Sequence, residues 1–189
     1  RICLNVLLEM GVDDNTRRVS PYAEFYRLFA ETGIKPFGSP VWTDPTRVKF
    51  TAWGSWLSAS SPYIYCPYEV VMVGYKEIWK KTQPGTTEIS SDDFKMGCSG
   101  IWRLRTQTAS HTKVEFHEDL PTICIKLLSW EGNIVYDPFM GSGTTAKAAM
   151  KNRRHYIGSE ISSEYCRIAR HRLVLCRGEM NQRKLSDWT

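Results

Sequence analysis

The stretch that most constrains the fold is VYDPFMGSGTTAKAAM, which runs from Val135 to Met150. A short apolar run leads into a Gly-Ser-Gly loop and then into helix-forming residues, which predicts a strand, a tight turn and a helix. In such a unit the glycines let the backbone approach a ligand, and the helix N-terminus attracts negative charge. Units of this kind usually open a nucleotide-binding domain, whereas this one lies near the end of a 189-residue chain.

The residues around the loop extend this unit into a larger pattern of alternating elements. Helical spacing predicts helices at 22–33, 118–132, 144–155 and 162–176. Apolar runs predict strands at 2–9, 37–42, 68–75, 133–139 and 156–161. We therefore expect an α/β fold with a mostly parallel sheet and helices on both faces.

Composition narrows the class of protein. Hydrophobic residues make up 42% of the chain, enough for a proper core, and no apolar run approaches the roughly 18 residues of a membrane-spanning helix. The six cysteines form no C-x-x-C pair and have no clustered histidines, so we expect no metal site. The net charge of +5 is compatible with a polyanionic partner without requiring one. We expect a soluble, cytoplasmic protein.

Three ligand classes fit a glycine loop of this kind. A nucleoside triphosphate loop needs a lysine after its last glycine, and here Thr144 follows Gly143. The dinucleotide fingerprint is satisfied by Gly141, Gly143 and Ala146, and Glu160 lies near the expected ribose position. That fingerprint normally lies on the first βα turn, so a dinucleotide enzyme would need a permuted sheet.

S-adenosylmethionine accounts for the same residues without a phosphate. Asp137 can accept a hydrogen bond from the ammonium of the methionine part, and the helix that starts near Thr144 can face its carboxylate. Glu160, at the end of the next strand, can accept from both ribose hydroxyls. Each acid alone is equally compatible with a structural role, whereas their joint spacing favours this ligand.

Two stretches, DPFMGSGTT and IGSEISSEYCRIARHRL, closely resemble the cofactor motifs of amino-group DNA methyltransferases, which methylate adenine N6 or cytosine N4. In the subgroup that the chain most resembles, the catalytic tetrapeptide and the target-recognition region precede the cofactor loop, which explains the late position of the loop. The resemblance implies a Rossmann-like S-adenosylmethionine-dependent methyltransferase fold. It also implies a single, incomplete methyltransferase domain over residues 1–189, with a target-recognition insertion at 76–110.

The same resemblance implies a set of cofactor contacts. VEFHEDLPTICIKLLS resembles the helix before the cofactor strand, which places Phe116 in the pocket, and Tyr165 is expected against the adenine. Core packing is the alternative for both rings. His117 stands where relatives usually have proline and His111 is one residue out of register, so neither receives a role. The implied contacts are Phe116, Asp137, Pro138, Phe139, Gly141, Ser142, Gly143, Thr144, Glu160 and Tyr165.

The catalytic motif of these enzymes, [DNS]-P-P-[YFW], does not occur in the sequence. Its first residue accepts from the target amino group while its aromatic ring stacks on the flipped base. We therefore assign no catalytic residue. In the family the strand that leads into this motif lies at the centre of the sheet, between the strands that ICLNVLLE and NIVYDPF resemble. We expect that this central strand is missing and that an N-terminal segment or a complementary chain supplies it.

Cations interleaved with aromatic residues indicate contact with double-stranded DNA. The leading hypothesis is the cofactor-binding part of a site-specific DNA methyltransferase of the restriction-modification type. One alternative is a noncatalytic subunit of a split methyltransferase that binds S-adenosylmethionine and DNA, and another is a permuted dinucleotide-binding oxidoreductase. The expected DNA contacts are Arg47, Lys49, Trp53, Trp56, Lys80, Lys81, Arg103 and Arg105.

Overall fold

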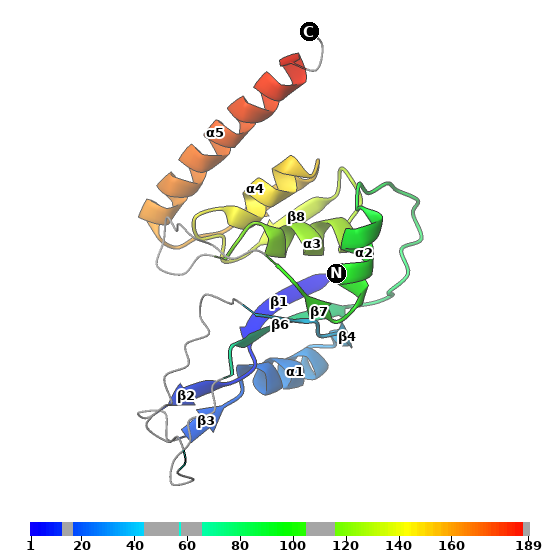
Figure 1. Cartoon of the computed structure of the whole chain (residues 1–189), viewed down its shortest axis with the longest axis vertical. Coiled ribbons are helices and arrows are strands. Elements are labelled where there is room, and N and C mark those ends of the chain that lie inside the picture. The colour runs from blue at the N-terminus through cyan, green and yellow to red at the C-terminus, as the bar shows by residue number, and fades with distance from the viewer. Residues whose placement is uncertain (13–16, 44–56, 58–65, 105–115, 187–189) are drawn as a thin grey trace. The chain divides into compact units, whose positions relative to one another are not determined.

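The computed structural model describes residues 1–12, 17–43, 57, 66–104 and 116–186, and the chain divides into two compact units (Figure 1). The first unit comprises Arg1–Thr82 and Lys95–Thr106, and the second comprises Gln83–Phe94 and Gln107–Thr189. The stretch at 76–110 is therefore shared between the units, and the single methyltransferase domain stays a prediction. Among the described residues, no helix is both long and apolar enough to cross a bilayer.

Strand β6 (Tyr68–Tyr75) is the centre of the first unit. Its side chains from Val70 to Val73 are all buried, as expected for a strand that is covered on both faces. It pairs antiparallel with β1 (Ile2–Leu7), β4 (Lys35–Gly38) and β5 (Val41–Thr43). Strand β5 in turn pairs parallel with the two-residue strand β7 (Ile101–Trp102), so β1 lies at one edge of this sheet.

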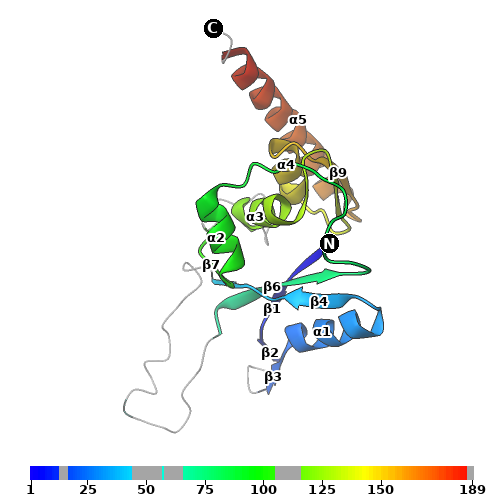
Figure 2. The same ribbon diagram turned by 90° about the vertical axis from the view of Figure 1, so that its right-hand side faces the viewer.

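Helix α1 (Pro21–Glu31) packs on this sheet against β1, β4 and β6, as Figure 2 shows. It begins one residue before the predicted start at 22, where the Ser20 hydroxyl accepts the Ala23 N–H at 3.2 Å and proline occupies the first turn. It ends before Gly33, whose φ of +72° suits glycine. The buried core beneath the helix consists of Val6, Phe29, Val70 and Met72.

Several features differ from the sequence predictions, which included neither helix α2 (Ser91–Cys98) nor strand β7. The stretch 37–42, expected as one strand, is divided between β4 and β5 at Ser39 and Pro40, where proline has no N–H to give to a ladder. A short hairpin of β2 (Met10–Val12) and β3 (Arg17–Val19) was not predicted. Its strands have three residues each, too few for an alternating pattern to be recognised.

The second unit contains a parallel β-α-β unit. Strands β8 (Ile134–Asp137) and β9 (His155–Gly158) pair in parallel, and helix α4 (Thr144–Lys151) connects them. Helix α3 (Asp119–Leu128) precedes β8 and packs on α4, and α5 (Ser163–Ser186) follows β9 and also contacts α4 (Figure 1). The core is formed by Ile125, Ala148 and Ala149, with Val135 and Tyr156 against it.

The α/β class is confirmed, with two corrections. Parallel pairing holds for β8 with β9, but a mostly parallel sheet is wrong for the first unit, where all three pairings of β6 are antiparallel. Helix α4 ends at Lys151 rather than at His155, because Arg153 has a φ of +58° and turns the chain into β9. Among the described residues, β8 pairs with β9 and with no other strand.

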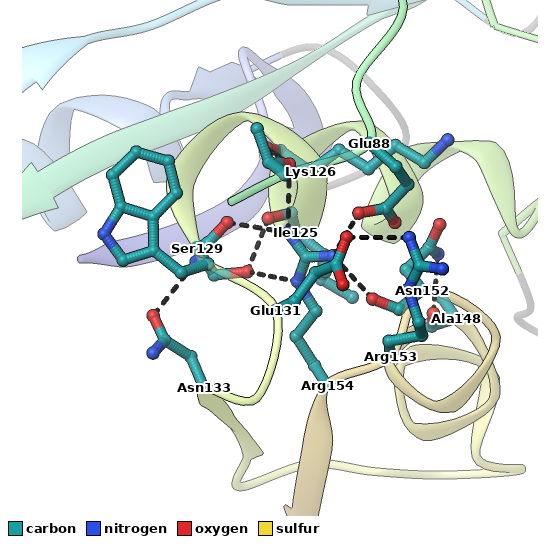
Figure 3. A network of polar contacts seen from close by, with 12 residues as sticks. Glu88, Ile125, Lys126, Ser129, Glu131, Asn133, Ala148, Asn152, Arg153 and Arg154 are labelled. Atoms are coloured by element: carbon teal, nitrogen blue, oxygen red, sulfur yellow. Dashed lines mark hydrogen bonds and ion pairs between the residues drawn. The ribbon is translucent and has the colours of Figure 1, made fainter. Parts of the chain in front are cut away.

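The buried side chain of Arg154 connects three segments of the second unit by hydrogen bonds (Figure 3). The Arg154 side chain is 0% exposed and donates to the Glu88 carboxylate at 2.7 Å and to the Ser129 carbonyl at 2.7 Å. It also donates to the Thr87 hydroxyl at 3.0 Å and to the Asn152 carbonyl. Burial raises the pKa of Glu88, but the hydrogen bond and charge of Arg154 outweigh it and hold that pKa below its ordinary value.

We predict that Arg154→Met lowers the free energy of unfolding by about 3 kcal/mol, because it leaves the Glu88 carboxylate and two carbonyls without their donor. Arg153→Met is the matched control. The Arg153 side chain is 64% exposed and makes an ion pair with Glu131, so its loss should cost about 0.5 kcal/mol or less. Denaturant titration of both variants measures the difference. Equal losses would contradict a structural role for the buried network.

Candidate functional site

The loops that follow β8 and β9 are hydrogen-bonded to each other. The Ser159 N–H donates to the Asp137 carbonyl at 3.0 Å, and the Met140 N–H donates to the Ser159 carbonyl at 2.9 Å. Since β8 and β9 are parallel, both loops leave the carboxyl edge of the pair, where ligands bind in open α/β sheets. The glycine loop thus lies beside the acidic turn that the sequence placed at Glu160.

The Glu160 carboxylate joins these two loops. One oxygen, Oε2, accepts the Gly141 N–H at 2.8 Å, and the other, Oε1, accepts the Ser162 N–H at 2.8 Å. These amides, Ser162 first and then Gly141, hold the pKa of Glu160 below its ordinary value, so the group is a carboxylate at neutral pH. The Ile161 amide also lowers this pKa, and a carboxylate, which offers about four acceptor positions, retains capacity to accept from a ligand.

The two glycines of the loop have different surroundings. Both are in the left-handed region, with φ of +53° at Gly141 and +85° at Gly143. A Cβ at Gly141 would meet only the Phe139 carbonyl, at 4.0 Å, so this part of the backbone faces open space. A Cβ at Gly143 would lie 3.1 Å from the Ala169 Cβ of α5. Gly143 therefore serves close helix packing, and Gly141 is the glycine past which a ligand can approach.

Two large apolar side chains in these loops are exposed. Phe139, which was predicted at the site, is 84% exposed, and its N–H is held by the Asp137 carboxylate at 3.0 Å. Ile161 directly follows Glu160 and is fully exposed. Sequence reasoning missed Ile161, although an apolar residue directly after an acidic strand end was a usable signal. Large apolar groups left bare beside polar acceptors are typical of a ligand surface.

The other predicted cofactor residues occupy several environments. Ser142 and Thr144 are buried, and their hydroxyls contact Arg172 of α5. Pro138 is exposed, whereas Tyr165 is half-buried in the first turn of α5, where its N–H donates to the Ser162 hydroxyl at 3.3 Å. Phe116 is half-buried just before α3.

The structure describes one of the two histidines that received no role from the sequence. His117 Nδ1 accepts the Asp119 N–H at 3.2 Å and lies 3.3 Å from the Asp119 carboxylate, so it caps the start of α3. His111 lies outside the described residues. No group of three histidine, cysteine or acidic side chains within the described part of the chain is placed to hold a metal ion.

Of the eight predicted DNA contacts, the structure describes three, and all three belong to the first unit. Lys80 and Arg103 are exposed, and Lys81 is half-buried. The remaining five, Arg47, Lys49, Trp53, Trp56 and Arg105, lie outside the described residues.

Comparison with known proteins identifies the family. The sequence model of the DNA methylase family for N6 and N4 methylation matches residues 12–171, which include β6, the glycine loop and Glu160. The chain belongs to the N6/N4 DNA methylase family. The matched span includes residues of both units, with β4, β5, β6 and β7 of the first unit and the glycine loop of the second, and it leaves out β1.

Relatives of known name are methyltransferases. The chain is 32% identical over 118 residues to the type II methyltransferase M.MjaVI of Methanocaldococcus jannaschii, an alignment that covers 62% of this chain and 59% of the relative. It is 69% identical over 83 residues to the orphan methyltransferase M.BamHII of Bacillus amyloliquefaciens, with 39% and 31% covered. The chain thus spans between 31% and 59% of the length of these relatives.

Solved structures share the fold. A putative DNA modification methylase of Thermus thermophilus, crystallised with S-adenosyl-L-methionine, superposes with a TM-score of 0.71 at 19% identity, covering 93% of this chain and 69% of that one. The cytosine-N4-specific PvuII DNA methyltransferase superposes with a TM-score of 0.66 at 16% identity, covering 88% and 61%. The methyltransferase fold expected from the sequence is confirmed.

We predict that Gly143→Ala destabilises this fold more than Gly141→Ala. Both place a Cβ on a left-handed residue, at a cost of about 1 to 2 kcal/mol, and Gly143→Ala adds the close contact with Ala169. Denaturant unfolding of both variants measures the difference. In a double-mutant cycle, Ala169→Gly should relieve part of the Gly143→Ala loss. Absence of coupling between these two positions would contradict the packing role of Gly143.

Proposed function

We propose that the chain binds S-adenosylmethionine at the glycine loop, next to Glu160. The observation that carries this proposal is the Glu160 carboxylate, which is ionised, is fixed by the backbone amides of Gly141 and Ser162 and has two oxygens that retain acceptor capacity. Two vicinal hydroxyls of a ribose match that pair of acceptors. The open space beside Gly141 gives the ligand access to the two carboxylate oxygens.

The remaining parts of the cofactor fit the residues around this point. Asp137, at the end of β8, can accept from the methionine ammonium, and the N-terminus of α4 after Gly143 attracts the carboxylate. Phe139 and Ile161 offer bare apolar surface for the purine, and Phe116 and Tyr165 remain candidates from the sequence. Family membership and the fold shared with a methylase crystallised with this cofactor support the proposal.

The proposed reaction is methylation of an exocyclic amino group of adenine or cytosine in double-stranded DNA. The bound cofactor supplies a methyl group on a positively charged sulfur. Residues of this chain hold both ends of the cofactor. Asp137 and the N-terminus of α4 bind the methionine part, and Glu160 binds the ribose. Lys80, Lys81 and Arg103 are the described candidates for phosphate contact. A noncatalytic role in binding cofactor and DNA for a partner subunit is the second candidate, because the sequence has no catalytic tetrapeptide.

We further propose that a segment carrying [DNS]-P-P-[YFW] completes the enzyme, either as the N-terminal part of the same protein or as a complementary chain. The open sheet edges support this. Among the described residues, β1 pairs with β6 alone and β8 pairs with β9 alone, so each presents an edge of unpaired backbone groups. Such edges are templates for an added strand. The permuted order of motifs that the resemblance implies, with the catalytic tetrapeptide before the cofactor loop, would agree with this arrangement.

Cofactor binding is tested by Glu160→Ala. The dissociation constant for S-adenosylmethionine, measured by titration calorimetry, should rise at least about tenfold, because a charged acceptor for two hydroxyls is lost. Glu164→Ala, an exposed acid in the first turn of α5, should bind like the unmodified chain. NAD should not bind to either. An unchanged dissociation constant in folded Glu160→Ala would contradict the ribose assignment.

The activity is tested by reconstitution. Transfer of radiolabelled methyl groups to DNA should require both the 189-residue chain and the segment with the [DNS]-P-P-[YFW] motif. The control is the same segment with the first residue of the motif replaced by alanine, which should bind the chain but remain inactive. Robust methylation of DNA by the 189-residue chain alone would overturn the proposed completion of the enzyme.

A further inference from the structure

Helix α5 reaches the glycine loop through a side chain that the proposed function does not use. Arg172 Nη1 donates to the Ser142 carbonyl at 2.9 Å, contacts the Ser142 hydroxyl and lies 3.4 Å from the Thr144 hydroxyl. Ser142 and Thr144 are 5% and 6% exposed. A single guanidinium nitrogen thus contacts the residues on both sides of Gly143.

The contact with Ser142 fixes a peptide plane in the loop. The Ser142 carbonyl and the Gly143 N–H belong to the same planar unit. Arg172 holds the carbonyl, and the Met140 carbonyl accepts the N–H at 2.9 Å. Rotation of this peptide would break both hydrogen bonds together. This peptide is only one residue away from Gly141 in the sequence, so its orientation limits the backbone conformation of Gly141.

Arg172 is placed by the same helix face that packs on Gly143. Ala169, whose Cβ lies beside Gly143, precedes Arg172 by three residues, so both project from one side of α5. A cation beside the N-terminus of α4 is unfavourable for the helix dipole. Hydrogen bonding to the loop, rather than attraction to the helix, therefore accounts for the position of Arg172.

We propose that Arg172 is a positioning residue that holds the glycine loop in its cofactor-binding conformation. This inference rests on the proposed binding of S-adenosylmethionine at the loop. The two left-handed residues of the Gly-Ser-Gly sequence, Gly141 and Gly143, give the loop more accessible conformations than an ordinary turn. Arg172 selects one of them before the cofactor arrives, so its loss reduces the fraction of protein that is competent to bind.

The cavity next to Arg172 makes a direct test available. It has a volume of about 470 Å³ and lies between α4 and α5, with Lys147, Ile168, Leu175 and Cys176 in its wall. A variant without the Arg172 head group leaves room there for a free guanidinium ion. A guanidinium ion from solution can therefore take the place of the Arg172 head group. Its effect tests the hydrogen bonds separately from the rest of the side chain.

The first experiment compares Arg172→Ala, Arg172→Lys and Arg170→Ala, the last of which removes an exposed cation two residues away on α5. The dissociation constant for S-adenosylmethionine should rise about tenfold in Arg172→Ala, less in Arg172→Lys, and not at all in Arg170→Ala. Hydrogen exchange of the ligand-free protein should be faster at residues 141–144 in Arg172→Ala alone. Guanidinium chloride at low millimolar concentration should restore part of the affinity of Arg172→Ala and leave Arg170→Ala unchanged.

The outcomes distinguish this inference from the proposed function. If the unmodified chain does not bind S-adenosylmethionine, the proposed function fails, while the hydrogen-exchange result still tests whether Arg172 holds the loop. If the unmodified chain binds and Arg172→Ala binds equally well with unchanged exchange at residues 141–144, the positioning role is overturned. Weaker binding that guanidinium does not restore, with exchange raised throughout the second unit, would also overturn it, because that pattern indicates general destabilisation.

Discussion

The hydrogen bonds between the Glu160 carboxylate and the backbone amides of Gly141 and Ser162 organise the candidate site. The bond from Gly141 joins the loop after β8 to the loop after β9, and the bond from Ser162 fixes the carboxylate within its own loop. An ionised carboxylate is suited to this task because hydrogen bonds to a charged acceptor are stronger than those between neutral groups. The same carboxylate keeps acceptor positions for a ligand, which links the architecture of the loops to the proposed cofactor.

Helix α5 supports the loop from the other side. Ala169 fills the space that a side chain at Gly143 would need, and Arg172 holds the Ser142 carbonyl. The loop is thus constrained by the Glu160 carboxylate and by a face of α5, and its backbone at Gly141 faces open space. The network around the fully buried Arg154 side chain has a different function, since it attaches the segment around Glu88 to other elements of the second unit.

Much of the fold could be predicted because its determinants are local. The helical spacing of α1, the apolar run of β6 and the strand, loop and helix around Gly141 each depend on residues a few positions apart. The acidic end of β9 was also predicted, since Glu160 follows a short apolar strand. The antiparallel pairing in the first unit was not, because strand direction depends on the route of the connecting chain and leaves little trace in apolar spacing.

The sequence by itself determined α1, α3, α4 and α5, the strands β1, β6, β8 and β9, the glycine loop and the acidic residue after β9, because periodicity and backbone preferences act over a few residues. Only the tertiary structure decided that Gly143 serves helix packing while Gly141 remains open, and that Ile161 lies bare beside Glu160. It also decided the hydrogen-bond partners of two arginines. Ser142 lies 30 residues from Arg172 in the sequence, and Glu88 lies 66 residues from Arg154. A long cationic side chain has the same local signal on a solvated surface and in a buried network, and only the packing of distant segments distinguishes the two.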